Sequence, residues 1–150
     1  MNIVTRSMIG FALAAACVVS SWAATKDEAI AQVNTAIAHI KKVGVEQAVK
    51  DINGNPEWKV KSMNVIVNDF KGVVLASSLN EKLVGKNTLE AKDPSGKAYV
   101  KEFMATATKG EGWVDYQFVN PETKKLEMRS MFVKKGVGFD GYVGVAITKQ

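Results

Sequence analysis

Aromatic side chains with polar tips gather in one short stretch of this chain, residues 111–125, which reads EGWVDYQFVNPETKK. Because side chains alternate between the two faces of a strand, Tyr116 shares a face with Phe118, and Trp113 lies on the other face. Tyrosine and tryptophan combine an apolar ring with one polar group, which suits the orientation of a small ligand in a pocket. We therefore expect Tyr116 and Trp113 to border a binding pocket, while the other apolar residues of the strand build the core.

Arg129 is the residue best suited to hold a negatively charged ligand. It lies between Glu127 and Met131 in a second stretch of strand type. A guanidinium group presents a planar fork of donors that matches the two oxygens of a carboxylate. The alternative is a surface arginine paired with Glu127 or Asp115, and the sequence leaves both interpretations open.

Residues for catalysis are scarce. His39 is the only histidine, so no histidine cluster can form around a metal ion. The serines lack a Gly-x-Ser-x-Gly context, and the Gly-x-Gly pairs at 110–112 and 136–138 lack the strand-to-helix setting of a phosphate loop. We expect no enzyme, no metal site and no cofactor.

The elements that must position these residues begin with helices. Thr25 and Glu28 have the spacing of a capping box, directly before an apolar stripe with steps of three and four residues. This pattern predicts an amphipathic helix of roughly five turns with one buried face. A second short stripe at 45–52 predicts another helix, which the turn residues at 53–56 end.

From residue 63 onward the periodicity changes to that of strands. The sequence predicts strands at 63–68, 73–77, 112–119, 126–134 and 141–148, and a helix at about 97–108. Short connections favour antiparallel neighbours. The predicted fold class is therefore α+β, a five-stranded antiparallel sheet with the long N-terminal helix on one face and short helices over a pocket.

Several segments, taken in order, resemble a single Cache domain of type 2. The segments are Val65–Ala76, Leu83–Asn87, Gly112–Tyr116, Asn120–Lys125 and Tyr142–Ala146. The resemblance covers about residues 26–148. Each segment is unspecific alone, and their order and spacing together carry the likeness.

The resemblance implies an extracytoplasmic sensor module with a PAS-like sheet, which binds small organic acids such as acetate, propionate, pyruvate or lactate. It also implies a role for Ser77, which stands at the end of its strand where the family often has histidine. Tyr99 and Lys101 would come from the helix that covers the pocket. The usual setting of such modules, in chemoreceptors and histidine kinases, suggests a membrane receptor or a histidine kinase as the partner.

The chain departs from the family pattern at two places. The family often reads Ala-His-Pro where this chain has Ala76-Ser77-Ser78, and it often has lysine and tyrosine where this chain has Arg129 and Phe132. Arg129 keeps the positive charge, but the loss of the histidine and the phenol changes the hydrogen-bonding groups of the pocket. The family's usual ligand therefore need not carry over.

The first residues read as a secretory signal peptide. Arg6 precedes an apolar run of about a dozen residues, and small residues around Ala23 follow. The run is too short for a membrane-spanning helix, which needs roughly 20 residues. We expect cleavage near Ala23, a single domain at 24–150 and a periplasmic or secreted protein, with lipidation at Cys17 as the weaker alternative.

Cleavage would remove Arg6 and the only cysteine, so the net charge would fall from +5 to +4. The lysine pairs are spread along the chain, whereas a nucleic-acid footprint requires basic residues clustered on one face. We therefore expect no nucleic-acid partner.

The sequence thus predicts a periplasmic module that binds a small organic acid and acts in signal transduction or chemotaxis through a partner protein. The alternative is a protein-interaction or structural module with a closed pocket, for which Ser77, Ser78 and Phe132 leave room. The apolar stripe of the long helix could also mediate a homodimer.

Overall fold

The computed structural model describes residues 23–120 and 123–149. The helices are α1 (Lys26–Val43), α2 (Val45–Ile52) and α3 (Tyr99–Thr108), and short 3-10 turns lie at Pro56–Trp58, Val60–Ser62 and Glu81–Leu83. The strands are β1 (Asn64–Asp69), β2 (Val74–Ser77), β3 (Glu111–Val119), β4 (Leu126–Lys135) and β5 (Gly141–Thr148). Among the described residues, no helix combines the length and apolarity needed to cross a membrane. Except for Ala23, the predicted signal peptide lies outside the described residues, as does Cys17.

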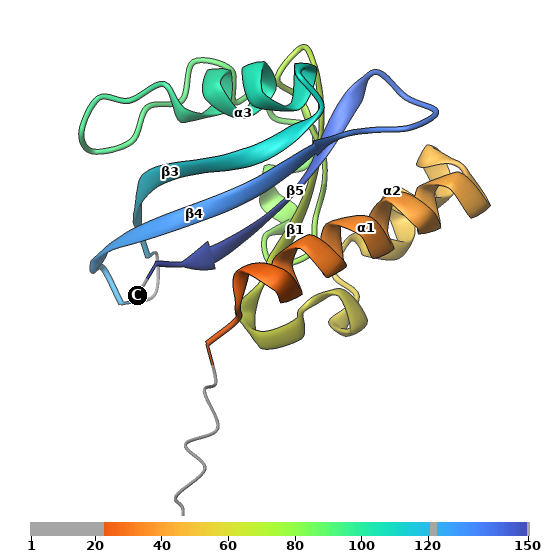
Figure 1. Ribbon diagram of the computed structural model, residues 1–150, viewed down its shortest axis with the longest axis horizontal. Helices are drawn as coiled ribbons and strands as arrows, with labels where there is room; N and C mark the ends of the chain where they lie inside the picture. The colour runs from red at the N-terminus through yellow and green to blue at the C-terminus, as the bar shows by residue number, and fades with distance from the viewer. Residues whose placement is uncertain (1–22, 121–122, 150) are drawn as a thin grey trace, which may run out of the picture.

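The five strands form one sheet in the order β2-β1-β5-β4-β3, and every pairing is antiparallel. Helix α1 crosses one face of this sheet, and α3 lies over the opposite face (Figure 1). The predicted α+β class and the five-stranded antiparallel sheet are confirmed. The predicted helix at 97–108 begins two residues later, at Tyr99.

The capping box predicted at the start of α1 is formed. The Thr25 hydroxyl accepts a hydrogen bond from the Glu28 amide at 3.2 Å, and the Glu28 carboxylate accepts one from the Thr25 amide at 2.8 Å. Acidic residues lie in the first turn and Lys41 and Lys42 in the last turn, which complements the helix dipole. Gly44, with a φ of +83°, lets the chain turn directly from α1 into α2.

Replacement of Thr25 by alanine is expected to lower the free energy of unfolding by about 1 kcal/mol, because the Glu28 amide loses its acceptor. Chemical denaturation of the two proteins measures this difference. Thr35→Ala, on the exposed middle of the same helix, is the matched control and should leave stability nearly unchanged or slightly raised. An equal loss in both variants would contradict the capping role.

The sheet separates two hydrophobic clusters. The cluster on the α1 face joins the helix stripe to inward residues of β1, β4 and β5, including Val33, Ile37, Val65, Phe132 and Val143. The cluster on the α3 face includes Phe103, Val114, Tyr116, Met131 and Tyr142. Since the apolar stripe of α1 is buried within its own chain, a dimer through α1 would have to use the polar side of the helix.

Candidate functional site

Three aromatic side chains form the centre of the α3 face. Tyr99 and Phe103 come from α3 and Tyr116 from β3. The rings of Tyr99 and Tyr116 are stacked with centroids 5.1 Å apart, and the ring of Phe103 meets Tyr116 edge-on at 5.3 Å. Burial raises the pKa of Tyr116 to about 12, although the nearby charge of Arg129 acts in the opposite direction. The Tyr116 hydroxyl therefore stays protonated at neutral pH and can donate a hydrogen bond.

Arg129 lies beside Tyr116, because the two residues are direct cross-strand partners on β4 and β3. Its guanidinium group stacks over the ring of Phe118, 4.2 Å from the ring centroid. Its Nε and Nη2 donate to one oxygen of Glu127 at 3.2 and 3.1 Å. The ion pair with Glu127 that the sequence left open is therefore formed, and Arg129 still faces the same side of the sheet as Tyr116.

Glu127 is itself held in place on this face. Asn120 donates a hydrogen bond to its other oxygen at 2.8 Å. This hydrogen bond, followed by the contact with Arg129, lowers the pKa of Glu127. Glu127 is thus ionised at neutral pH and supplies an internal carboxylate to the guanidinium group. A ligand carboxylate would have to share Arg129 with Glu127 or displace it.

Trp113 lies on the opposite face of the sheet from Tyr116. Its ring packs against Phe132 at 5.3 Å, and the ammonium group of Lys26 lies 5.1 Å from the ring centroid. Both contacts belong to the α1 side. Trp113 and Tyr116 therefore cannot line the same pocket, because the sheet separates them. The expectation that they share one pocket is corrected by this placement.

Ser77 is completely buried and engaged in protein contacts. Its hydroxyl donates to Asn64 at 3.2 Å and accepts from the Asn80 amide at 3.2 Å. Its own amide donates to the side chain of Asn53 at 2.9 Å. These contacts fasten the end of β2 to β1 and to the loops around it. Ser77 therefore has a structural role at the edge of the sheet, where its contacts hold the end of β2 in place.

Lys101 lies on the exposed side of α3, where its ammonium group forms an ion pair with Glu90 at 2.8 Å. Tyr99, two residues earlier in α3, packs against the aromatic cluster. The structure thus brings together Tyr99, Tyr116 and Arg129, and it places Trp113, Ser77 and Lys101 elsewhere.

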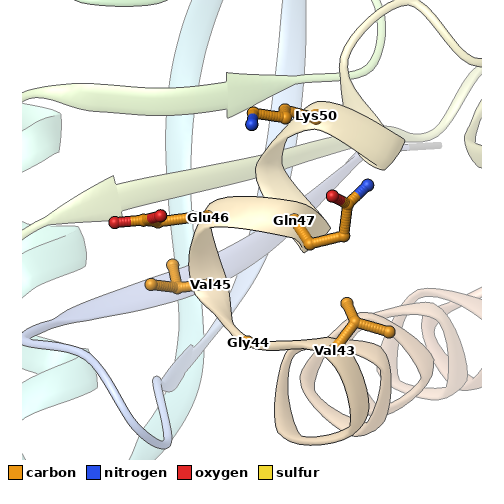
Figure 2. Close-up of a pocket in the computed structure, with 6 residues that line it drawn as sticks. All are labelled: Val43, Gly44, Val45, Glu46, Gln47 and Lys50. Atoms are coloured by element: carbon orange, nitrogen blue, oxygen red, sulfur yellow. The ribbon is translucent and has the colours of Figure 1, made fainter.

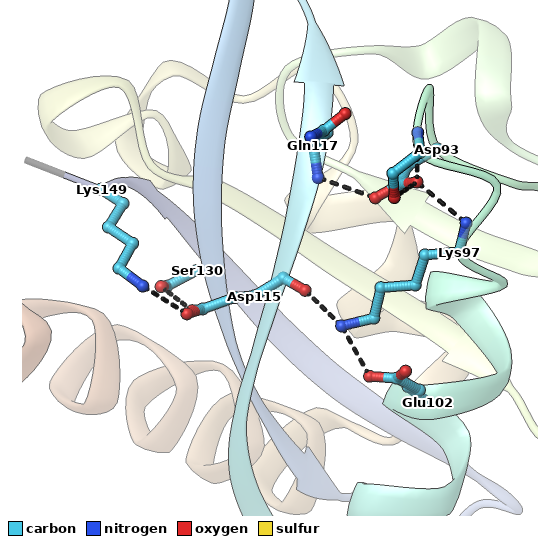
Figure 3. Close-up of polar contacts among 8 residues, drawn as sticks. Asp93, Lys97, Glu102, Asp115, Gln117, Ser130 and Lys149 are labelled. Atoms are coloured by element: carbon cyan, nitrogen blue, oxygen red, sulfur yellow. Dashed lines mark hydrogen bonds and ion pairs between the residues drawn. The ribbon is translucent and has the colours of Figure 1, made fainter.

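A loop residue that the sequence did not single out, Asp93, borders the same edge of the sheet. Its Oδ2 accepts from the Gln117 amide at 3.0 Å, while its Oδ1 accepts from Ser95 and from the Lys97 amide (Figure 3). Lys97 in turn donates to the carbonyl oxygen of Asp115 at 2.6 Å. These contacts satisfy two backbone groups of edge strand β3, the Gln117 amide and the Asp115 carbonyl, and they hold the loop that precedes α3. The sequence signal was the turn pattern Asp-Pro-Ser-Gly at 93–96.

Asp93→Asn is expected to remove an acid-sensitive part of the stability. The hydrogen bond from Ser95, followed by the amides of Gln117, Lys97 and Ser95, lowers the pKa of Asp93 from 3.8 to about 2. Its stabilising contribution is therefore fully present above about pH 4 and is lost as the pH falls through about 2.

Chemical denaturation at a series of pH values from about 7 to about 2 tests this expectation. The free energy of unfolding of the wild type should fall more steeply below about pH 4 than that of Asp93→Asn, which should already be less stable at neutral pH. Asp140→Asn, at an exposed position of the β4–β5 turn, is the control. Parallel pH profiles of wild type and Asp93→Asn would contradict the assignment.

Two cavities lie away from this cluster. One of about 400 Å³ is lined by residues 43–47 and Lys50 at the corner where α1 ends and α2 begins (Figure 2). The other, of about 320 Å³, lies between α2, β2 and Val84 and is lined mainly by valine side chains and Leu75. Neither is lined by a residue that the sequence predicted for the site. Within the described residues, no group of three or more acidic, histidine or cysteine side chains is arranged to hold a metal ion.

Solved structures with the same fold belong to chemotaxis proteins. A methyl-accepting chemotaxis protein from Vibrio parahaemolyticus matches with a TM-score of 0.67 and 17% identity, over 82% of this chain and 87% of its own. A periplasmic sensor domain of a chemotaxis protein matches with a TM-score of 0.61 and 20% identity, over 83% and 90%.

A Cache chemosensory domain, whose structure explains its recognition of carboxylic acids, matches with a TM-score of 0.66 and 20% identity, over 83% of this chain and 92% of its own. At these identities the likeness concerns the fold. A comparison with curated proteins gives no match. The model of the family described as Single Cache domain 2 matches residues 14–149, and this chain therefore belongs to the Single Cache domain 2 family.

Proposed function

We propose that this chain is a periplasmic sensing module that binds a small organic acid on the α3 face of its sheet. The observation that carries the proposal is the family match over residues 14–149, since the module it describes is a sensory ligand-binding domain. A structural neighbour recognises carboxylic acids. We infer a non-enzymatic role, in which ligand binding is transmitted to a membrane receptor or histidine kinase.

The proposed site consists of Arg129, Tyr116 and Tyr99. Arg129 supplies the positive charge, and Glu127 occupies only the Nε and Nη2 edge of its fork. Arginine has five donors, so the N–H groups of the other edge can donate hydrogen bonds to a ligand carboxylate. Tyr116 adds a protonated hydroxyl next to Arg129, and Tyr99 covers it from α3. Ligand entry would require the stacked rings of Tyr99 and Tyr116 to separate.

A thermal-shift screen of the purified protein against acetate, propionate, pyruvate and lactate tests the proposal. A ligand that binds the folded state alone stabilises it by about 2.7 kcal/mol at about 100 times its dissociation constant, which raises the melting temperature. A dose-dependent rise with at least one acid is expected. A cooperative melt that no acid shifts would reject the ligand assignment.

The packing of the aromatic cluster favours a second candidate function, a protein-interaction module with a closed pocket. Tyr99, Phe103 and Tyr116 contact one another directly, and Arg129 already holds an internal carboxylate. If this function holds, none of the four acids should shift the melting temperature. A pull-down under native conditions should then identify a protein partner.

The export proposal has its own test. Mass spectrometry of the protein recovered from the periplasmic fraction should give the mass of a chain that begins at Ala24. Retention of residues 1–23, or a lipid on Cys17, would contradict cleavage near Ala23.

A further inference from the structure

Asn68 is a polar side chain that lies inside the α3 face without a partner. It stands on β1 and is 2% exposed, and its Oδ1 accepts no hydrogen bond from any part of the chain that the structure describes. In the β1–β5 ladder it is the direct partner of Tyr142, whose ring belongs to the cluster beneath α3. Cross-strand partners share a face of the sheet, so the Asn68 amide points to the side on which Tyr142 and Tyr116 lie.

This position is unfavourable for an amide. A buried acceptor loses its hydrogen bond to water, and unless another donor replaces water the folded state is destabilised. The preceding residues Val65, Ile66 and Val67 are all apolar, so the rest of this part of the strand belongs to the hydrophobic core. An apolar side chain of similar size would fit the same place without that loss. Such an orphaned acceptor in a native fold requires an explanation.

The surroundings of Asn68 restrict what could satisfy it. Tyr142, directly opposite, is 1% exposed, and the ring of Phe70 lies 6.0 Å from that of Tyr142. Burial raises the pKa of Tyr142 above its ordinary value, so this ring carries no charge at neutral pH. Asp69, the next residue, points away from this face by strand alternation, and its carboxylate accepts hydrogen bonds from the amides of Lys71 and Val73. A carboxylate offers acceptors only, so the apolar wall and the unpartnered Oδ1 together favour a ligand that carries a hydrogen-bond donor.

Asn68 is also far from Arg129 on the same face. Tyr142 pairs with Lys135 of β4, whereas Arg129 pairs with Thr148, so the two residue pairs are six residue steps apart along β4. At about 3.3 Å per residue this is roughly 20 Å. An acid of two to four carbons cannot contact both residues.

We propose that Asn68 is the anchor of a second ligand position on the α3 face, which takes a small molecule that carries a hydroxyl or ammonium donor and no carboxylate. Oδ1 of Asn68 accepts the hydrogen bond of the donor, and the rings of Tyr142 and Phe70 cover the carbon atoms. The position is independent of Arg129 and does not require that an organic acid bind there.

The test uses ethanolamine and ethylene glycol as donor-bearing probes and acetate as the acceptor-only control. In isotope-labelled protein, NMR should show that both donor probes shift the side-chain amide signals of Asn68, whereas acetate leaves them in place. The same probes should raise the melting temperature of the wild type and of Arg129→Ala. This independence separates the proposal from the acid site, because either can fail alone.

Asn68→Leu should abolish the thermal shift with both probes and should melt at a temperature equal to or above that of the ligand-free wild type. Asn34→Leu, on the exposed face of α1, is the matched control and should keep the response. Amide signals of Asn68 that neither probe moves would overturn the proposal, as would a thermal shift that persists in Asn68→Leu. A crystal structure in the presence of the probes that shows only a water molecule on Asn68 Oδ1 would also overturn it. The NMR experiment uses the wild type, so it can still refute the proposal if Asn68→Leu fails to fold.

Discussion

Replacement of Arg129 by alanine is expected to weaken the binding of a small carboxylate by roughly 10- to 100-fold. A hydrogen bond to a charged group contributes about 1.5–3 kcal/mol, and each factor of ten in affinity corresponds to about 1.4 kcal/mol. The effect should lie at the upper end of this range because Arg129 is largely shielded from water, with a side chain that is 16% exposed. Isothermal titration of the acid identified by thermal shift measures it.

Two further variants make this test specific. Lys101 lies on the solvent-exposed side of α3, where it is paired with Glu90. Lys101→Ala removes this cation and should leave the affinity for the acid unchanged. Glu127→Gln removes the internal carboxylate that competes for Arg129, so it should maintain or increase the affinity. Equal losses in Arg129→Ala and Lys101→Ala would mean that only the overall charge matters, and full affinity in Arg129→Ala would place the acid elsewhere.

Replacement of Phe103 by alanine is expected to lower the free energy of unfolding by about 3–5 kcal/mol, the range for truncation of a buried aromatic residue. Phe103 is 3% exposed and connects α3 to the sheet through edge-on contacts with Tyr99 and Tyr116. Its loss leaves a cavity at the centre of the α3 face that the rigid strands beneath cannot collapse to fill. Urea denaturation followed by circular dichroism measures the change.

Glu102→Ala is the matched control for Phe103, because Glu102 lies next to it on the exposed side of α3, where it pairs with Lys97. Surface ion pairs contribute little to stability, so this variant should lose only a small fraction of what Phe103→Ala loses. A loss in Phe103→Ala below about 1 kcal/mol would mean that α3 is not firmly packed on the sheet. The two tyrosines would then be free to move apart, and ligand entry would need no rearrangement of the core.

Local sequence patterns predict the helices and strands and the alternation of side chains along each strand. The start of α1 follows from Thr25 and Glu28, because a capping box is closed by residues three positions apart. The alternation of Val114, Tyr116 and Phe118 on one face of β3 follows from the two-residue period of a strand. The fold class and the family likewise follow from the order of these local patterns, and both are confirmed.

Which side chains meet depends on the long-range packing of the fold. Alternation separates Trp113 from Tyr116, but only the packing of α1 and α3 shows that Trp113 meets the α1 core and Tyr116 the α3 cluster. The hydrogen bond from Gln117 to Asp93 and the pairing of Asn68 with Tyr142 join residues far apart in the chain. Strand register and the assignment of helices to faces depend on the burial of the whole molecule at once, whereas a sequence pattern reports only on neighbours within a few residues.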